Sequence, residues 1–328
     1  MGGCSAPGLS RGLEALKTSP EPTHIEPLTT EQVLTEAGRV GFDRAGVTLP
    51  ILHTKYTAAF RQWLAADSAG EMHWMRKWSN FDQVIRRRWA WAQSVIVVCR
   101  NYYQKQEPFA GPRLARYAMG QDYHLIMPEL MDRLIENLKR IYPKLRTQIY
   151  SDTGPVLQKA FAEQAGIGWI GKNTLLIVPD IGSFVFIGLI FCDCELQPTS
   201  PLTEDCGDCT FCLRSCPNAA LVQPGVLDAH RCIAYLTIEK QSAFTAAERK
   251  NLHNWLYGCD LCQECCPKNQ QWAKTTGEQR FLVHAESLRR TWVEWCQLDA
   301  RRFAELFRCS AVRRLGYRRF RRNLAALR

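Results

Sequence analysis

Two runs of cysteines in the second half of the chain have the residue type and the spacing of iron–sulfur ligands. The first reads C-x2-C-x2-C-x3-C-P over residues 206–217, and the second reads C-x2-C-x3-C-P over residues 259–267. Two residues between thiolates let a tight turn point three sulfurs toward three corners of one cubane, and the proline after the last cysteine ends that turn. The chain is therefore predicted to hold two 4Fe–4S clusters and to move single electrons at low potential.

The last cysteine of each such run ligates the other cluster, which assigns most of the thiolates. Cluster one is expected to be held by Cys206, Cys209, Cys212 and Cys266. Cluster two is expected to be held by Cys216, Cys259, Cys262 and a fourth cysteine. Spacing leaves two candidates for that fourth ligand, Cys232 and Cys265. A pair of zinc knuckles is the alternative, because C-x2-C pairs also bind zinc, but zinc does not need the trailing Cys-Pro twice.

Length and composition indicate a folded protein that is long enough for two domains. The chain has 328 residues, 46% hydrophobic content and ten tryptophans. Residues 1–28 are rich in Gly, Pro, Ser and Thr and are predicted to be a flexible leader without the charged and apolar regions of a secretion signal. The longest apolar stretch, residues 174–192, is interrupted by Pro179 and Gly182 and favours a pair of strands over a membrane span. We therefore expect a cytoplasmic protein that does not cross a membrane.

The charge of the chain, +10 overall, is concentrated at its C-terminal end. Residues 289–328 hold twelve arginines and no lysine against three acidic residues. Six of these arginines stand as pairs around Tyr317 and Phe320, namely Arg313, Arg314, Arg318, Arg319, Arg321 and Arg322. Guanidinium groups beside aromatic rings suit phosphate contacts and base stacking, so we favour a polyanionic partner. A solvated basic helix and a docking site for an acidic redox partner are the alternatives.

The region before the cysteines alternates between helical and extended patterns. Helices are predicted over residues 30–40, 58–66, 71–78, 127–142 and 156–165. Strands are predicted over residues 94–99, 148–150, 175–178 and 184–191. An α/β domain of about 170 residues is therefore expected to precede the cluster module.

Three features of this domain could contribute chemistry. Asp152 follows a strand at a helix entrance, where catalytic groups often lie, although an ordinary turn aspartate is the more common case. Asp122 and His124 could ligate a metal, although a single histidine near aromatic residues is more often packed in a core. The glycine-rich turn over residues 166–173 follows a helix instead of opening one, so it is neither a dinucleotide fingerprint nor a phosphate-binding loop.

In these motifs the chain resembles the epoxyqueuosine reductases, the cobalamin-dependent enzymes of the last step of queuosine synthesis in tRNA. The resemblance extends from about residue 30 to the C-terminus and is specific, because several unusual motifs occur in one order. The matching segments are residues 70–75, 117–124, 151–156, 166–177, 227–239 and 257–262. Members often carry a longer helical-repeat extension after the cluster module, so part of the family's RNA-binding surface is in doubt here.

The resemblance implies a mixed fold, α+β or α/β, in three parts. A nitroreductase-like cobalamin-binding domain is expected over residues 29–195, and a bacterial-type two-cluster ferredoxin module over residues 196–275. A short basic helical segment over residues 276–328 is expected to contact tRNA. The family pattern also selects Cys232 as the fourth ligand of cluster two and leaves Cys265 as a spare thiol.

The resemblance further implies a mechanism in which cob(I)alamin attacks an epoxide carbon while Asp152 protonates the departing oxygen. Burial near the corrin is expected to raise the pKa of Asp152. Because the D-x-H-x-x-G motif is absent, cobalamin is expected without a histidine ligand from the protein. Cobalamin contacts are expected from Arg76, Tyr117, Asp122, His124, Gly171, Lys172, Asn173, Asp260 and Leu261.

The implied partners are a tRNA carrying epoxyqueuosine and an external low-potential electron donor, a flavodoxin or ferredoxin system, acting on a monomer. A reductive dehalogenase-like enzyme with a small electrophile as its substrate is one alternative, although the twin-arginine signal usual in that class is absent. A non-catalytic iron–sulfur electron carrier is another. An RNA-binding protein with a structural cluster is the third.

Overall fold

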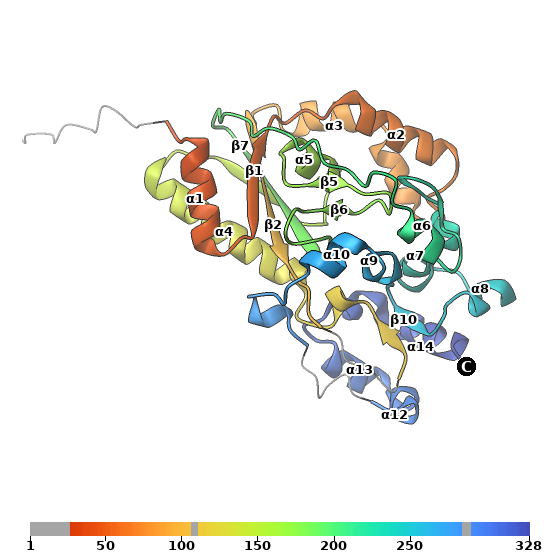
Figure 1. Ribbon diagram of the computed structural model, residues 1–328. Helices are drawn as coiled ribbons and strands as arrows, with labels where there is room; N and C mark the ends of the chain where they lie inside the picture. Colours follow the sequence, from red (N-terminus) through yellow and green to blue (C-terminus); the bar gives the residue numbers. More distant parts are fainter. Residues whose placement is uncertain (1–26, 106–110, 284–289) are drawn as a thin grey trace, which may run out of the picture.

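The computed structural model describes residues 27–105, 111–283 and 290–328. Its largest sheet has the strand order β1-β2-β7-β4, and each neighbouring pair is antiparallel (Figure 1). These strands are β1 (Arg44–Thr48), β2 (Ser94–Asn101), β4 (Thr147–Tyr150) and β7 (Val185–Cys192). Three short ladders pair β3 (Arg113–Leu114) with β10 (Trp255–Tyr257), β5 (Trp169–Ile170) with β6 (Leu176–Ile177), and β8 (Leu221–Gln223) with β9 (Val226–Leu227).

The helices fall into three groups along the chain. The first group is α1 (Thr30–Val40), α2 (Thr54–Ala65), α3 (Phe81–Arg88), α4 (Tyr123–Ile141) and α5 (Gln158–Gln164), with the 3-10 helices η1 (His73–Trp78) and η2 (Arg116–Ala118). The cysteine-rich part contains η3 (Ala229–Arg231), α6 (Phe211–Ser215), α7 (Ile233–Ile238), α8 (Ala246–Lys250), α9 (Leu261–Glu264) and α10 (Pro267–Trp272). The C-terminal part contains η4 (Gln279–Phe281), α12 (Trp292–Gln297), α13 (Ala300–Leu306), η5 (Ala311–Leu315) and α14 (Gly316–Ala326).

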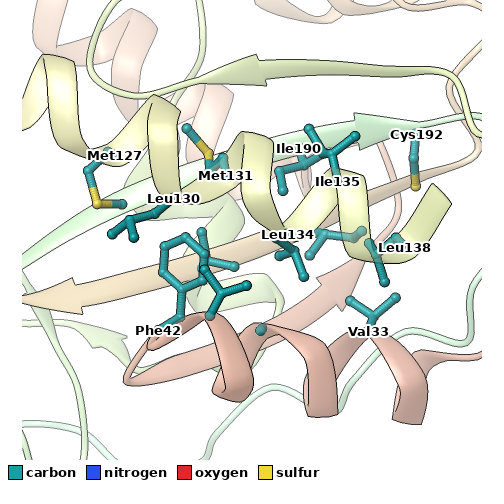
Figure 2. Packing of buried hydrophobic residues seen from close by; sticks show 14 of the residues in the cluster. Val33, Phe42, Met127, Leu130, Met131, Leu134, Ile135, Leu138, Ile190 and Cys192 are labelled. Carbon is teal, nitrogen blue, oxygen red and sulfur yellow. The ribbon is translucent and has the colours of Figure 1, made fainter. Parts of the chain in front are cut away.

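The central strands are buried on both faces because helices cover each side of the sheet. Successive side chains of a strand point to opposite faces, and β2 accordingly sends Ile96 and Val98 to one core and Val95 and Val97 to the other. On the first face α1 and α4 lie across the strands, and Figure 2 shows Leu134 of α4 packed in this layer. The second face is covered by α3 and α5. The sheet therefore forms a rigid centre from which loops extend toward the cysteine-rich part.

Most of the predicted elements of this domain are confirmed, with shifted ends. The helix over residues 30–40 has the predicted bounds, with Thr29 as its capping-box residue. Helix α4 begins at Tyr123, four residues before the predicted start, because the Asp122 side chain accepts the His124 N–H and caps it. The segment predicted as a helix over residues 71–78 is a 3-10 helix that begins only at His73. With an antiparallel central sheet, the domain is of the α+β type.

The C-terminal part has a hydrophobic core of its own that also takes in residues from the first domain. Leu114 and Met119 pack in one cluster with Trp295, Phe307 and Phe320. Phe320 is fully buried, so the prediction that it stacks on bases is wrong. The shared core fixes the C-terminal helices against the first domain as well as the cluster module.

The predicted leader lies almost entirely outside the described residues. Its last residue, Leu28, is described and is only 2% exposed in the core of the first domain, so the leader prediction is wrong at that end. Among the described helices, none combines the length and the apolar character needed to span a bilayer.

Candidate active site

A cavity of about 600 Å³ lies beside the central sheet. Helix α2, the 3-10 helix η1, the start of α5 and strand β7 supply its walls, which are rich in aromatic side chains. The aromatic residues that line it are Tyr56, Phe60, Trp74, Trp78, Tyr102, Tyr117, Tyr123 and Phe186. Asp152 and Lys159 also line this space. A largely apolar cavity with few polar groups suits a large, flat organic ligand.

Asp152 occupies a turn that holds its backbone in an uncommon conformation. Strand β4 ends at Tyr150, and Asp152 then adopts a positive φ of 58°, which side-chain-bearing residues seldom do. Its N–H donates to the Gln158 side chain at 3.1 Å. The Tyr123 hydroxyl donates to the Asp152 carboxylate at 2.6 Å, and this carboxylate remains 60% exposed. Backbone strain at an accessible carboxylate is typical of functional positions.

His124 lies between two carboxylates. Its Nδ1 is 2.6 Å from Asp122 Oδ1, and its Nε2 is 3.3 Å from Asp152 Oδ2. The Arg314 guanidinium also contacts Nε2. Nδ1–H can donate to Asp122 in either charge state, whereas Nε2 donates to Asp152 only when it is protonated and otherwise accepts from Arg314. The arrangement therefore has two proton states that differ at the Asp152 carboxylate.

The electrostatics of this group correct one prediction. Burial alone would raise the pKa of Asp152, but hydrogen bonds from His124 and Tyr123 outweigh burial and lower it. Burial alone would lower the pKa of His124, yet the hydrogen bonds and charges of Asp122 and Asp152 raise it. The expected raised pKa of Asp152 is therefore wrong for this structure, in which the hydrogen bonds favour a charged Asp152 carboxylate and a protonated His124.

A smaller pocket of about 260 Å³ adjoins the cavity. The two spaces share Tyr117, Tyr123 and Asp152 in their walls. The far wall of the pocket comes from the cysteine-rich and C-terminal parts, through Glu239, Gln241, Tyr257, Arg314, Leu315 and Arg319. Asp152 thus lies where a ligand in one space can meet a ligand in the other.

The cysteines gather into two groups. In one group, burial and the neighbouring thiols Cys232 and Cys216 raise the pKa of Cys259 to about 12. Cys262 lies in the same group, because Cys259 and Cys232 raise its pKa after burial does. Cys232 is thus a charge neighbour of the other three thiols, whereas Cys265 neighbours Cys262 in this group and Cys209, Cys212 and Cys266 in the other.

The other group contains Cys206, Cys209 and Cys212, and Cys266 packs with Cys206 in a small hydrophobic cluster. The spare thiol Cys265 lies beside this group, since its charge and that of Cys206 raise the pKa of Cys212 to about 11 after burial does. Buried thiols with raised pKa values become thiolates only beside a cation. Both groups therefore suit the iron of a 4Fe–4S cluster, which supplies that charge.

Several predicted cobalamin contacts lie elsewhere in the structure. Asn173 is buried and donates to the Cys262 carbonyl at 3.3 Å, while the Lys172 ammonium contacts the Gly207 carbonyl. The turn over residues 171–173 therefore joins the first domain to both cysteine loops instead of lining the cavity. Its glycine is required by close packing, because a Cβ on Gly171 would lie 2.6 Å from the Ile177 side chain.

Three further predicted contacts have protein partners of their own. Asp260 is only 1% exposed and accepts the Arg116 N–H at 2.7 Å. Arg76 pairs with Asp67 at 2.8 Å, and Leu261 packs in a small cluster with Ile233. Of the predicted set, Tyr117 lines both spaces, His124 lines the smaller pocket, and Asp122 holds His124.

Sequence reasoning missed most of the cavity wall. Phe60, Trp78 and Lys159 had no motif that marked them, whereas Trp74, Tyr117, Tyr123 and Asp152 belonged to matching segments. The Lys159 ammonium donates to the Thr174 carbonyl at 2.6 Å. A spacing of four residues between Trp74 and Trp78 was the available signal, since it places both rings on one side of a short helix.

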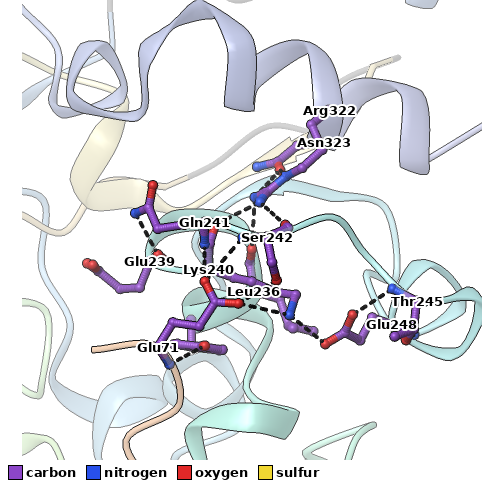
Figure 3. A network of polar contacts seen from close by, with 11 residues as sticks. Glu71, Leu236, Glu239, Lys240, Gln241, Ser242, Thr245, Glu248, Arg322 and Asn323 are labelled. Atoms are coloured by element: carbon purple, nitrogen blue, oxygen red, sulfur yellow. Dashed lines mark hydrogen bonds and ion pairs between the residues drawn. The ribbon is translucent and has the colours of Figure 1, made fainter. Parts of the chain in front are cut away.

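The conspicuous Gly-Glu-Met segment is a clamp between domains. The Glu71 carboxylate accepts hydrogen bonds from the backbone N–H groups of Gln241 and Ser242 and pairs with Lys240 at 3.3 Å (Figure 3). Burial opposes the charge, but these bonds lower the pKa of Glu71 to about 2. Gly70 is needed beside it, because a Cβ there would lie 2.4 Å from the Tyr235 ring.

The six arginines predicted to contact tRNA differ in whether their side chains are exposed or donate hydrogen bonds to the protein backbone. Arg319 donates to the carbonyls of Ile238 and Leu315, and Arg322 donates to those of Lys240 and Ser242 (Figure 3). These two arginines satisfy carbonyls near the end of α7 and dock α14 onto the cluster module. Arg321 donates to the Cys296 carbonyl at 2.6 Å and Arg313 to the Arg308 carbonyl at 3.2 Å. Arg318 is exposed.

Comparisons with known proteins agree with this arrangement. Residues 83–153 match the family model "Epoxyqueuosine reductase QueG, DUF1730", and residues 205–269 match the model "4Fe-4S double cluster binding domain". The chain is 38% identical over 302 residues to the epoxyqueuosine reductase of Gloeobacter violaceus, covering 90% of this chain and 94% of that one.

Two solved structures share the fold. A crystal structure of epoxyqueuosine reductase with an epoxyqueuosine-modified tRNA-Tyr stem loop is 28% identical, with a TM-score of 0.79 over 90% of this chain and 80% of that one. The enzyme from Bacillus subtilis, solved with its catalytic aspartate loop swung out of the active site, is 26% identical, with a TM-score of 0.81 over the same shares. The chain belongs to the epoxyqueuosine reductase family.

Proposed function

We propose that this chain reduces epoxyqueuosine to queuosine in tRNA, using cobalamin and two 4Fe–4S clusters. The observation that carries the proposal is the position of Asp152, held by Tyr123 and His124 where a large apolar cavity meets a smaller polar pocket. Membership in the family and the tRNA stem loop bound by a relative support it. The reaction removes an epoxide oxygen and leaves an alkene and water, which takes two electrons and two protons.

The aromatic cavity is the proposed cobalamin site. Reduced cobalamin supplies a strong nucleophile for an epoxide carbon. Phe60, Trp74 and Trp78 would pack against the ring system and exclude water from it. The residues that line the cavity in the described chain include no histidine, so its walls offer cobalt no imidazole.

Asp152 is the proposed proton donor to the epoxide oxygen. The Tyr123 hydroxyl orients its carboxylate, and His124 holds the proton that Asp152 passes on. A loop with a catalytic aspartate moves in the Bacillus subtilis relative, and the strained turn at Asp152 is a suitable place for such movement. The second proton would come from solvent.

The proposed roles of the parts of the chain, its electron donor and its oligomeric state follow from this mechanism. The cobalamin domain is assigned to residues 29–195, the cluster module to residues 196–275 and the tRNA-contacting segment to residues 276–328. Electrons would enter from an external low-potential donor of the flavodoxin or ferredoxin type. We assign the protein to the cytoplasm as a monomer, because one tRNA approaches one pocket.

The pH dependence of turnover tests the role of His124. Because Asp122 and Asp152 raise the pKa of His124 above its ordinary value of 6.5, we expect turnover to fall as the pH rises through that raised pKa. The pairing itself contributes stability in a window, lost as pH falls through the lowered pKa of Asp152 and as it rises through that of His124. In His124→Gln the alkaline limb should disappear from single-turnover pH profiles. A limb that persists unchanged in this variant would remove His124 from the proton path.

Substitutions of the C-terminal arginines should affect either tRNA binding or the stability of the protein, depending on the contacts of each side chain. Arg318→Ala should weaken tRNA binding and reduce the slope of log K against log salt by about 0.7–0.9, because an exposed guanidinium can release one counterion. Arg322→Ala should instead lower the melting temperature, because it removes the arginine donor from partly buried carbonyls near the end of α7. Salt titrations of tRNA binding and thermal melts of both variants check this. An unchanged salt slope in Arg318→Ala would refute its contact with phosphate.

The experiment that tests the function is anaerobic reconstitution with iron, sulfide and cobalamin, followed by incubation with epoxyqueuosine tRNA and a strong reductant. Mass spectrometry of the nucleosides should show the loss of one oxygen atom, dependent on cobalamin. Bound cobalamin with unchanged tRNA would overturn the proposal in favour of a small electrophile as substrate. Failure to bind cobalamin would favour an electron carrier.

A further inference from the structure

The pocket next to Asp152 contains a carboxylate without a protein partner. Among the described residues, the Glu239 side chain makes no hydrogen bond or ion pair, although it lines the pocket with Arg314 and Arg319. Its backbone carbonyl accepts from Gln241, and in Figure 3 its side chain extends away from the surrounding network. Burial raises the pKa of Glu239, so its surroundings in the protein disfavour the charged form of this carboxylate. A half-buried carboxylate of this kind is suited to a ligand that donates hydrogen bonds.

The size and walls of the pocket suit one flat heterocycle. Its volume of about 260 Å³ is below the 300–1,000 Å³ typical of drug-sized ligands and is too small for a corrin. Tyr117 and Tyr257 line it and pack against each other, with ring centroids 5.9 Å apart and ring planes tilted by 44°. Enzymes that act on a nucleobase take it out of the stack, pack it against aromatic residues and read its Watson–Crick edge.

We propose that Glu239 binds the Watson–Crick edge of the modified base, a 7-deazaguanine, by accepting its N1–H and 2-amino groups. These two donors stand side by side and match the two oxygens of one carboxylate. The 2-amino group and the substituted carbon 7 lie on opposite sides of the bicycle. A base held at Glu239 therefore directs its epoxide-bearing arm toward the shared wall with Asp152. This assignment rests on the proposed function and adds the residue that selects the base.

Substitution of Glu239 distinguishes a contact with the base from a simple effect of charge, because the two predict opposite changes in tRNA binding. Loss of an anion should strengthen binding of a polyanion, whereas Glu239→Gln places an amide donor against a base donor. We expect the KM for epoxyqueuosine tRNA to rise about ten- to a hundredfold, with bound cobalamin, clusters and melting temperature unchanged. Glu305→Gln is the matched control, because Glu305 is exposed, pairs only with Arg301 among described residues and should show the charge effect alone.

Unmodified anticodon stem-loops that compete with epoxyqueuosine tRNA test whether Glu239 contacts the Watson–Crick edge of the base. Stem-loops with guanosine or inosine at the wobble position lack the cyclopentane arm and differ only in the 2-amino group. The wild type should be inhibited more strongly by the guanosine stem-loop, and Glu239→Gln should lose this preference. Equal inhibition of the wild type by both stem-loops would overturn the assignment. If Glu239 instead contacted the amine of the substrate's side arm, Glu239→Gln would still raise the KM, but the wild type would not distinguish the two stem-loops. If the wild type leaves epoxyqueuosine tRNA unchanged, the proposed function itself fails.

Discussion

Asp152→Asn is expected to slow deoxygenation of tRNA by about 10²–10⁴-fold, the usual contribution of a general acid. The amide retains the shape of the side chain and tolerates the positive φ at this position, but it has no proton to give. Binding of cobalamin, the iron content and affinity for tRNA should stay unchanged, because within the described part of the chain the carboxylate forms hydrogen bonds only with Tyr123 and His124. Anaerobic single-turnover rates read by nucleoside mass spectrometry provide the measurement.

Asp180→Asn is a close control for this substitution. Asp180 also has a positive φ, 62°, on an exposed turn, and it pairs weakly with Arg44 away from the cavity. The same chemical change in the same backbone conformation should leave turnover unaltered. If Asp152→Asn retained the rate of this control, the proton would come from another group, and Lys159 in the cavity wall would be the next residue to test.

Cys232→Ser is expected to remove one of the two clusters and to abolish turnover. Its thiol lies with those of Cys216, Cys259 and Cys262, and a cubane with three cysteine ligands is readily lost. Iron should fall from about eight to about four atoms per chain, with acid-labile sulfide falling in parallel. Electron paramagnetic resonance of the reduced protein should then show one isolated cluster.

Cys265→Ser tests the choice between the two candidate ligands. Cys265 lies one residue from the predicted ligand Cys266 and is half-buried like Cys232, but its thiol is a neighbour of Cys212 in the other group. This variant should retain both clusters and full turnover. Loss of cluster two in Cys265→Ser, with a full iron content in Cys232→Ser, would reverse the assignment.

Local patterns in the sequence predicted local structure well. Each cysteine run and its trailing proline restrict one turn of chain, so spacing alone predicted a double-cluster module, which the family model over residues 205–269 confirms, but left the fourth ligand of cluster two open between Cys232 and Cys265. The periodicity of residues 30–40 and 94–99 also located a helix and a strand, because each pattern is set by which face of one element is buried. The end of α4 was predicted within one residue, whereas its start required the cap at Asp122.

Charge and aromatic content at the C-terminal end did not reveal the role of each side chain. Arg318 and Arg322 belong to the same arginine-rich segment, yet one faces solvent and the other donates to carbonyls at the end of α7. Phe320 looked available for base stacking and is fully buried. Successive residues of a helix point in different directions, so the packing of the helix against its neighbours decides which arginine faces solvent.

The amino-acid sequence by itself determined the iron–sulfur chemistry, because cluster binding depends on residue type and on short spacing within each cysteine run. Only the tertiary structure decided where that chemistry meets a substrate. Asp152, His124 and Arg314 are far apart in sequence and come together because α4, the turn after β4 and the C-terminal segment converge on one pocket. The same packing places Glu239 in the wall of this pocket and brings the turn over residues 171–173 into contact with the cysteine loops. Contacts between distant segments depend on how the cores assemble, and no local pattern encodes that.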